Sequence, residues 1–242
     1  MPEPPASRDL SISLYHPVSA FDGLLAEGSA VAEALSPDFS LSGLLPEEEA
    51  LVAGAAEARR REFATGRQCA RRALQQLGVA PVAIGVGSFR EPLFPPGIAG
   101  SITHTREYCA AAVVRTGQVL SIGIDAEFNQ PLNRSVADLV LTPHERQMIG
   151  AFCYGCFADS LLFSIKEAFF KAIFPFCRQY LEFGDAIVAL SPADRTFRVY
   201  LLRPDVAARL GHARLIGRYR FDTRHLYTAV LLLSPPRTPN LG

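Results

Sequence analysis

Two acidic residues close an apolar stretch near the middle of the chain. Asp125 and Glu127 follow residues 119–124, whose apolar side chains predict a strand. Side chains two positions apart on a strand point to the same face, so both carboxylates could bind one hard cation. An acidic strand end that faces water would give the same pattern. The pair alone leaves both interpretations open.

A second group of charges lies on a predicted helix at residues 159–173. Phe163, Glu167 and Lys171 are spaced four residues apart, so they form one stripe of that helix. The flanking residues are strongly apolar and predict a largely buried helix, in which charges need partners. A metal ion and a diphosphate would supply those partners, whereas a surface Glu–Lys pair is the simpler alternative.

The lysines of the chain are confined to this helix. The sequence contains 22 arginines but only two lysines, Lys166 and Lys171. Because a lysine ammonium is compact and an arginine fork is planar, this placement indicates a need for ammonium groups there.

Candidate anion-binding groups lie earlier in the chain. Arg59 and Arg67 belong to an arginine-rich segment beside a predicted helix break at residues 63–66, and arginine forks bind phosphate in a bidentate manner. Ser101 and His104 follow a Pro/Gly-rich loop, where a turn can also bind an anion. A solvated helix face and a structural histidine are the corresponding non-functional interpretations.

The composition excludes several classes of protein. The 242 residues carry 24 basic and 24 acidic side chains, so the chain lacks the basic excess of a dedicated nucleic-acid binder. Its apolar runs are far shorter than the roughly 20 residues of a membrane-spanning helix, and residues 1–14 lack a secretory pattern. A cytoplasmic location with mostly reduced cysteines is the default expectation. The C-x-x-C at residues 153–156 lacks the second ligand pair of a zinc site.

The elements that must position these residues predict an α+β fold. Helices are expected at residues 46–77, with a break at 63–66, and at 135–139, 143–153 and 159–173. Strands are expected at residues 11–15, 82–86, 109–115, 119–124, 186–190, 197–202 and 225–233, and a loop at 91–100. This order favours two similar-sized α+β lobes, residues 1–118 and 119–242. We expect no internal sequence repeat.

Four motifs are more specific in their order and spacing than each is alone. They are Arg-x-x-Glu-Phe-x-x-Gly-Arg-x-Cys-Ala, Glu-Pro-x-Phe-Pro-x-Gly-x-x-Gly-Ser-Ile-Thr-His, Gly-Ile-Asp-x-Glu and Phe-Ser-x-Lys-Glu-Ala-x-x-Lys-Ala. Over roughly residues 57–175 the chain closely resembles the 4'-phosphopantetheinyl transferases of the surfactin and enterobactin synthetase branch. The resemblance implies a monomeric pseudo-dimer of two α+β lobes with the active site in the cleft between them.

The resemblance also implies a reaction and its catalytic groups. The serine hydroxyl of an acyl or peptidyl carrier protein would attack the β-phosphate of coenzyme A, releasing adenosine 3',5'-bisphosphate. Asp125, Glu127 and Glu167 would bind Mg²⁺, and Lys171 would stabilise the diphosphate. Glu167 would accept the serine proton, directly or through a metal-bound water.

Coenzyme A contacts follow from the same resemblance. Arg59 and Arg67 would hold the adenosine 3'-phosphate, and Ser101 and His104 would contact further phosphates. Lys166 would lie beside the diphosphate, next to Lys171.

The chain departs from the family pattern at three positions. Phe94 and Phe163 stand where the family often has tryptophan, so the apolar wall for the pantetheine arm is expected to be smaller. Phe89 stands where a lysine is frequent, and Arg90 would take the place of that lysine.

Two other functions compete with this interpretation. One is a different Mg²⁺-dependent phosphoryl transferase or hydrolase, although neither G-x-x-x-x-G-K-[ST] nor G-x-G-x-x-G is present. The other is a non-catalytic module of the same fold that binds coenzyme A or a carrier protein, but such a module need not retain the three carboxylates and Lys171 together. The sequence does not specify a fatty acid, polyketide or nonribosomal peptide carrier. We expect neither nucleic acid nor membrane as a partner.

Overall fold

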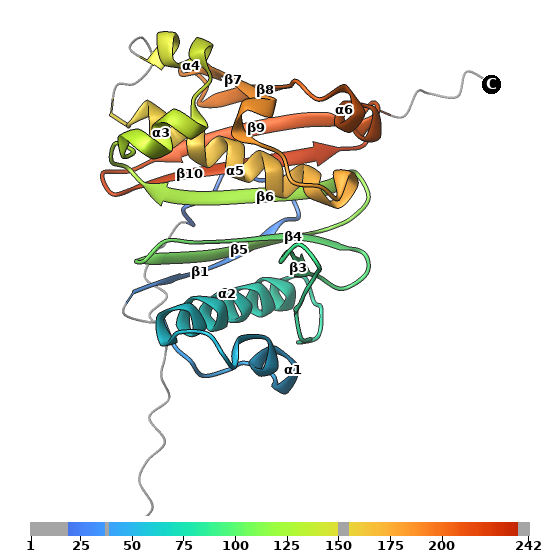
Figure 1. The fold of residues 1–242 in the computed structure, drawn as a ribbon. Helices are drawn as coiled ribbons and strands as arrows, with labels where there is room; N and C mark the ends of the chain where they lie inside the picture. The colour runs from blue at the N-terminus through green and yellow to red at the C-terminus, as the bar shows by residue number, and fades with distance from the viewer. Residues whose placement is uncertain (1–18, 37–38, 150–154, 237–242) are drawn as a thin grey trace, which may run out of the picture.

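The computed structural model describes residues 19–36, 39–149 and 155–236 and confirms an α+β fold with two lobes (Figure 1). The strand expected at residues 11–15 lies outside the described residues. No helix in the described ranges is long and apolar enough to span a bilayer.

The N-terminal lobe is a three-stranded antiparallel sheet with one long helix on its outer side. Its strands β1 (Ala30–Leu35), β4 (Ile98–His104) and β5 (Tyr108–Arg115) are arranged in the order β1-β5-β4. Helix α2 (Glu57–Gln76) lies along this sheet and is preceded by α1 (Pro46–Glu49) and the 3-10 turn η1 (Ala50–Val52). A small hairpin, β2 (Gly85–Val86) and β3 (Pro92–Leu93), follows α2.

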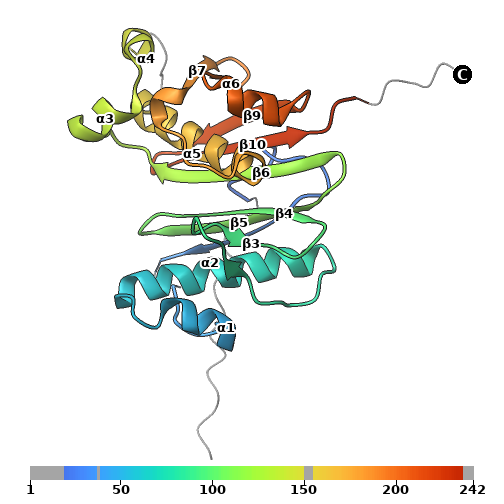
Figure 2. The same cartoon turned by 45° about the vertical axis from the view of Figure 1, so that its right-hand side comes forward.

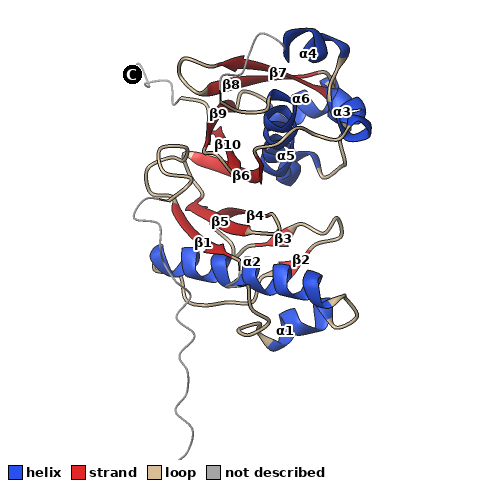
Figure 3. Ribbon diagram, turned by 90° about the vertical axis from the view of Figure 1, so that its left-hand side faces the viewer, coloured by secondary structure: helices blue, strands red, loops and turns tan. Residues whose placement is uncertain are grey.

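The C-terminal lobe repeats this plan with a larger sheet. Its strands are β6 (Val119–Phe128), β7 (Ala186–Ser191), β8 (Thr196–Leu201), β9 (Arg214–Phe221) and β10 (His225–Leu233), in the order β6-β10-β9-β8-β7. Helix α5 (Ala158–Cys177) covers the face of this sheet that points away from the N-terminal lobe (Figures 2 and 3). The shorter helices are α3 (Arg134–Val140), α4 (Pro143–Met148), η3 (Phe183–Asp185) and α6 (Pro204–Leu210).

An apolar core joins the two sheets. Successive side chains of β5 point to opposite faces, and both faces are buried. One face, which β5 shares with β1, packs on α2, whereas the other packs on β6 and β10 of the C-terminal lobe. Burial on both sides explains why residues 109–115 form an almost continuous apolar run.

Several expectations about the elements were wrong. Helix α2 runs without a break through residues 63–66. Gly66 lies inside this helix where it packs closely on β4, since an added Cβ would lie 3.1 Å from Ile102 Cγ2. The interruption lies at residues 53–56 instead. The expected loop at 91–100 contains β3 and the start of β4, and β1, β9 and α6 were missed.

A short sequence pattern occurs once in each lobe. The pattern Leu-x-Pro-x-Glu occurs at residues 44–48 and again at 141–145. In both copies the proline opens a short helix, and the glutamate is buried, with Glu48 0% and Glu145 2% exposed. Each glutamate anchors its short helix to the long helix of the same lobe.

Glu48 is the anchor of the N-terminal lobe. Its Oε2 accepts a hydrogen bond from Leu45 N (3.1 Å), and its Oε1 accepts one from Ile84 N (2.9 Å). Arg71 of α2 donates to the same carboxylate (2.7 Å from Nη1 to Oε1). The anchor therefore ties together α1, α2 and the residue that directly precedes β2.

Glu145 plays the matching part in the C-terminal lobe. Its Oε2 accepts a hydrogen bond from Thr142 N (2.9 Å), and its Oε1 accepts one from Val188 N (2.9 Å). Lys166 of α5 donates to Oε2 (2.8 Å). This anchor joins α4, α5 and β7.

Candidate active site

The acidic pair of β6 faces helix α5. In the β6–β10 register Asp125 lies opposite Thr228, and Glu127 lies opposite Leu226. Directly opposed residues of antiparallel strands share a face. The Thr228 hydroxyl donates to Ser164 O of α5 (3.0 Å), so this face points toward α5. The two carboxylates therefore lie on one face, as the spacing predicts.

Gly123 brings α5 onto this strand. A Cβ at this position would lie 1.9 Å from Ala168 O and 2.7 Å from Ala172 N, both backbone atoms of α5. Only a residue without a side chain allows such an approach. Glu167 directly precedes Ala168, and Lys171 directly precedes Ala172, so the close packing places both charged residues beside the acids of β6.

Lys171 and Asp125 form the charged centre of the site. Lys171 Nζ lies 2.6 Å from Asp125 Oδ1 and 3.2 Å from Ile124 O, and it donates to both. Asp125 is 4% exposed. Burial alone would lower the pKa of Lys171, but Asp125 and Glu167 outweigh it and the net pKa is raised, so the ammonium stays charged.

The other two carboxylates hold their protons more tightly than usual. Burial, together with the charge of Asp125, raises the pKa of Glu127 to about 7. Burial and Asp125 also raise the pKa of Glu167, against the opposing effect of Lys171. Among the contacts just described, three carboxylates face one ammonium group, so the site carries excess negative charge when all three are ionised.

The side-chain donors at this site are of the kind that binds a hard divalent cation, although they do not converge on one point. Asp125 Oδ2 is buried and has no hydrogen-bond partner, which leaves a carboxylate oxygen to be satisfied by an ion or water. Carboxylate oxygens are the ligands that Mg²⁺ prefers. Within residues 19–36, 39–149 and 155–236, however, no three His, Cys, Asp or Glu side chains converge closely enough to hold a metal as they stand.

Hydroxyl groups of β4 reach this site from the N-terminal lobe. Ser101 Oγ accepts a hydrogen bond from Ile124 N (3.0 Å), and Thr103 Oγ1 accepts one from Ala126 N (3.0 Å). Thr103 Oγ1 also donates to Asp125 Oδ1 (3.2 Å). Ser101 is 3% exposed and engaged with β6, so the structure places it in the lobe interface and not at a substrate surface.

Thr103 is a site residue that sequence reasoning missed. It lies two positions after Ser101 on β4, and the two-residue period of a strand places it on the same face. That alternation was the signal available in the sequence.

The predicted phosphate-binding residues divide into two kinds. Arg59 Nη1 lies 2.9 Å from His104 Nε2, so the structure brings this pair together at the edge of the site. Burial lowers the pKa of His104, and the nearby charges of Arg59 and Lys171 lower it further. Arg67 instead is 5% exposed and donates to Ile84 O (2.8 Å) and Gly85 O. Its guanidinium positions the β2–β3 hairpin.

That hairpin reaches across to the C-terminal lobe. At its tip the ring of Phe89 lies 5.3 Å from that of Phe174 and 5.4 Å from that of Tyr180, and Glu91 pairs with Arg178 (3.2 Å). Phe174 is one turn beyond Lys171 on α5. The aromatic ring that replaces the family lysine therefore contacts the end of the helix that carries the site.

Arg90, the proposed substitute for that lysine, adopts a left-handed backbone conformation with φ of 69° and is exposed. Its backbone N–H donates to Gly87 O (2.9 Å), within the hairpin itself. Its role therefore stays a prediction.

Lys166 is a correction to the sequence analysis. Its ammonium is 0% exposed and donates to Glu145, Val140 O (2.8 Å) and Phe183 O (3.0 Å). These contacts lie inside the C-terminal lobe, on the side of α5 away from Lys171. The structure therefore makes Lys166 part of the fold and not of the diphosphate site.

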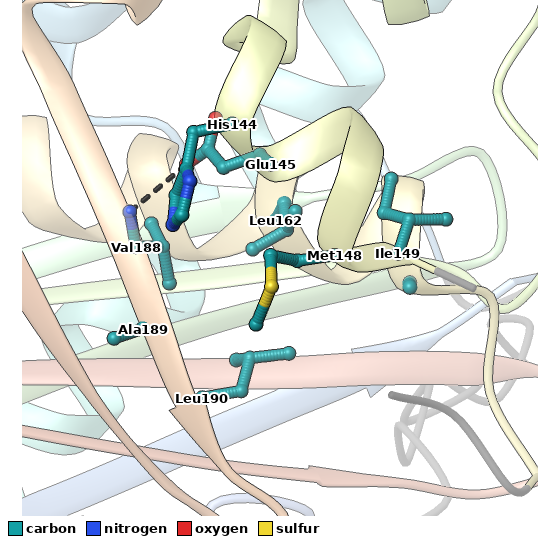
Figure 4. A pocket seen from close by; sticks show the side chains of 9 residues that line it. His144, Glu145, Met148, Ile149, Leu162, Val188, Ala189 and Leu190 are labelled. Carbon is teal, nitrogen blue, oxygen red and sulfur yellow. Dashed lines mark hydrogen bonds between the residues drawn. The ribbon is translucent and has the colours of Figure 1, made fainter. Parts of the chain in front are cut away.

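A separate pocket of about 260 Å³ lies between α4, α5 and β7 (Figure 4). Its lining is mostly apolar and includes Met148, Leu162 and Leu190. Glu145, at its wall, is already hydrogen-bonded to Val188 N. The pocket borders the anchor of the C-terminal lobe and includes none of the acids of β6.

Comparison with known families divides the chain as the fold does. Residues 47–114 match the model described as 4'-phosphopantetheinyl transferase N-terminal domain. Residues 121–223 match the model described as 4'-phosphopantetheinyl transferase superfamily.

Individual proteins show the same similarity. The 4'-phosphopantetheinyl transferase Svp of Streptomyces mobaraensis is 39% identical over 209 residues, 84% of each chain. The 4'-phosphopantetheinyl transferase Npt of Nocardia iowensis is 43% identical over 149 residues, 62% of this chain and 67% of that protein. Enterobactin synthase component D of Escherichia coli (strain K12) is 35% identical over 116 residues, 47% of this chain and 54% of that protein.

Proposed function

The chain belongs to the 4'-phosphopantetheinyl transferase superfamily, a family of enzymes, and from this premise we propose a Mg²⁺-dependent reaction. In it, the 4'-phosphopantetheine arm of coenzyme A is transferred to a serine of an acyl or peptidyl carrier protein, and adenosine 3',5'-bisphosphate is released. The observation that carries this proposal is the partly buried contact between Lys171 and Asp125, with Asp125 Oδ2 left unpartnered beside two further carboxylates.

Asp125, Glu127 and Glu167 would hold the magnesium ion, whose positive charge stabilises the diphosphate during transfer. Lys171, whose pKa is raised, would keep its proton and donate to the same diphosphate. Glu167 is the proposed acceptor of the serine proton, because its raised pKa brings its basicity closer to the neutral range. Arg59 and His104 form the proposed phosphate contact at the cleft edge.

A monomer suffices for this reaction, since both lobes that form the site come from one chain. Magnesium dependence, coenzyme A and the carrier can be tested together by intact-mass analysis. We expect an apo carrier protein to gain one phosphopantetheine when incubated with this protein, coenzyme A and Mg²⁺, and to gain none with EDTA. Coenzyme A binding without any mass gain on several carriers would favour the non-catalytic module.

The substitution Glu167→Gln tests the assigned site. Glutamine keeps the shape of glutamate but removes its negative charge. We expect turnover to fall by at least about 100-fold while the far-UV circular dichroism stays unchanged. Glu57→Gln is the matched control, because Glu57 lies on α2 in an exposed pair with Arg61. Near-normal turnover of Glu167→Gln would remove Glu167 from the mechanism.

A further inference from the structure

Strand β6 has a free edge that the N-terminal lobe covers with side chains. It is the outer strand of its sheet, pairing with β10 on one side. Backbone N–H groups on the other side of an outer strand have no strand partner. Here Ser101 and Thr103 of β4 accept hydrogen bonds from Ile124 N and Ala126 N, each at 3.0 Å. Two hydroxyl oxygens thus take the place of a neighbouring strand.

The two hydroxyls differ in one respect. The oxygen of Thr103 already accepts from Ala126 N, and its own O–H donates to Asp125 Oδ1 (3.2 Å). Ser101 shares the backbone contact but has no described contact with the carboxylate. Comparing the two residues therefore separates the effect of bonding to the β6 backbone from the effect of bonding to the Asp125 carboxylate.

The contacts of Asp125 are strongly one-sided. Oδ1 receives Lys171 Nζ at 2.6 Å and the Thr103 hydroxyl, whereas the buried Oδ2 receives no hydrogen bond. Two donors on one oxygen hold the carboxylate in a fixed orientation and leave the other oxygen available.

We propose that Thr103 is a positioning residue that holds the Asp125 carboxylate so that Oδ2 is presented to a divalent cation. This inference rests on the proposed function, because it assumes that Asp125 is a metal ligand. Thr103 belongs to the N-terminal lobe and Asp125 to the C-terminal lobe. The hydrogen bond between them would therefore make metal binding depend on how the two lobes pack. Partners of this kind typically change metal affinity or activity by about 10–100-fold when removed.

The test compares Thr103→Val, Thr103→Ser and Ser101→Ala. Valine keeps the shape of threonine without the hydroxyl, serine keeps the hydroxyl, and Ser101→Ala removes a backbone acceptor without touching Asp125. Two readouts are needed: binding of Mn²⁺ in the presence of coenzyme A, followed through the electron paramagnetic resonance signal of free Mn²⁺, and the Mg²⁺ concentration for half-maximal carrier modification.

We expect Thr103→Val to weaken Mn²⁺ binding and raise the half-maximal Mg²⁺ concentration by about 10-fold or more. Thr103→Ser should stay within about threefold of the parent protein, and Ser101→Ala should lose thermal stability comparable to Thr103→Val with metal binding unchanged. If valine prevents folding, Thr103→Cys, which keeps a side chain of similar size but is a weak donor, replaces it.

Equal metal binding by Thr103→Val and Ser101→Ala would overturn the inference while leaving the proposed function intact. A parent protein that neither binds Mn²⁺ nor modifies any carrier would overturn both.

Discussion

Glu127 links the protonation of a single side chain to the stability of the metal-free protein. Its pKa in the fold is raised to about 7, above the 4.5 of an unperturbed glutamate. An acid with a raised pKa binds more protons folded than unfolded between these values, so its contribution to stability is lost as the pH rises through them. At pH 8 the folded protein carries an unfavourable buried charge.

Glu127→Gln should therefore become more stable relative to the parent protein as the pH rises. Without metal, we expect the difference in unfolding free energy to grow by about 1–3 kcal/mol between pH 5 and pH 8, because each pKa unit corresponds to about 1.4 kcal/mol. Urea unfolding at several pH values in EDTA measures it. A difference that does not change with pH would show that Glu127 titrates normally.

The two lysines of α5 should respond differently to substitution. Lys166→Met removes one partner of a buried pair, which costs about 3–5 kcal/mol of stability, yet the folded fraction should keep its Michaelis constant for coenzyme A. Lys171→Met should lower turnover by about 100-fold or more. Unfolding and steady-state kinetics on both variants separate these effects. A stable Lys166→Met with weakened coenzyme A binding would place Lys166 at the substrate after all.

The sequence already contained the information that separates these lysines. Five residues correspond to about 500° of helix rotation, so Lys166 and Lys171 point roughly 140° apart around α5. Their shared helix was visible in the sequence, but the partner of Lys166, Glu145, lies in a different helix. Nothing in the local pattern of residues around Lys166 identifies that distant carboxylate.

Helix α5 can position Glu167 and Lys171 only because Gly123 of β6 has no side chain and so allows the helix to pack closely on the strand. Gly123→Ala would drive a Cβ into Ala168 O, and because backbone cannot rotate away, the helix must shift. We expect a loss of about 3 kcal/mol or more in stability and a large loss of turnover. Gly54→Ala is the control, because nothing lies within 4 Å of an added Cβ there. Thermal unfolding and carrier modification test both; a Gly123→Ala protein with normal turnover would mean that the helix spacing is not critical.

The elements that the sequence predicted well are those with a clear apolar pattern. Strand β10 matches its predicted bounds, and α5 was placed within a few residues. Strand β1 was missed because its sequence, Ala-Val-Ala-Glu-Ala-Leu, consists mostly of helix-forming residues, and pairing with β5 overrides that preference. In β9 the arginines and Gly217 dilute the strand pattern. For these strands the deciding interactions are long-range.

For the molecule as a whole, the core between the sheets predicts cooperative unfolding. Side chains from β5, β6 and β10 form one cluster, so neither lobe can unfold without exposing the apolar face of the other. The sequence contains no tryptophan, so single reporters can be introduced. Leu51→Trp in η1 and Tyr200→Trp in β8 replace exposed side chains in the two lobes. We expect coincident urea transitions from both reporters, and two separate transitions would contradict a shared core.

The order of helices and strands predicted two α+β lobes, but the way in which they meet could not be derived from local patterns. A pattern shows that both faces of residues 109–115 are apolar and not which elements cover them. The expectation of an active site in a cleft between the lobes came from the family resemblance alone. The hydroxyl contacts from β4 to β6, which depend on the exact register of two strands in different sheets, came only from the structure.

The covered edge of β6 also suggests a use for the protein as a molecular sensor. Within the described residues the backbone passes from one sheet to the other once, at residues 116–118. Cutting the chain there would give two fragments that each expose an apolar sheet face, and the second would also expose an unpaired strand edge. Fused to two other proteins, such fragments should regain carrier modification only when those proteins associate.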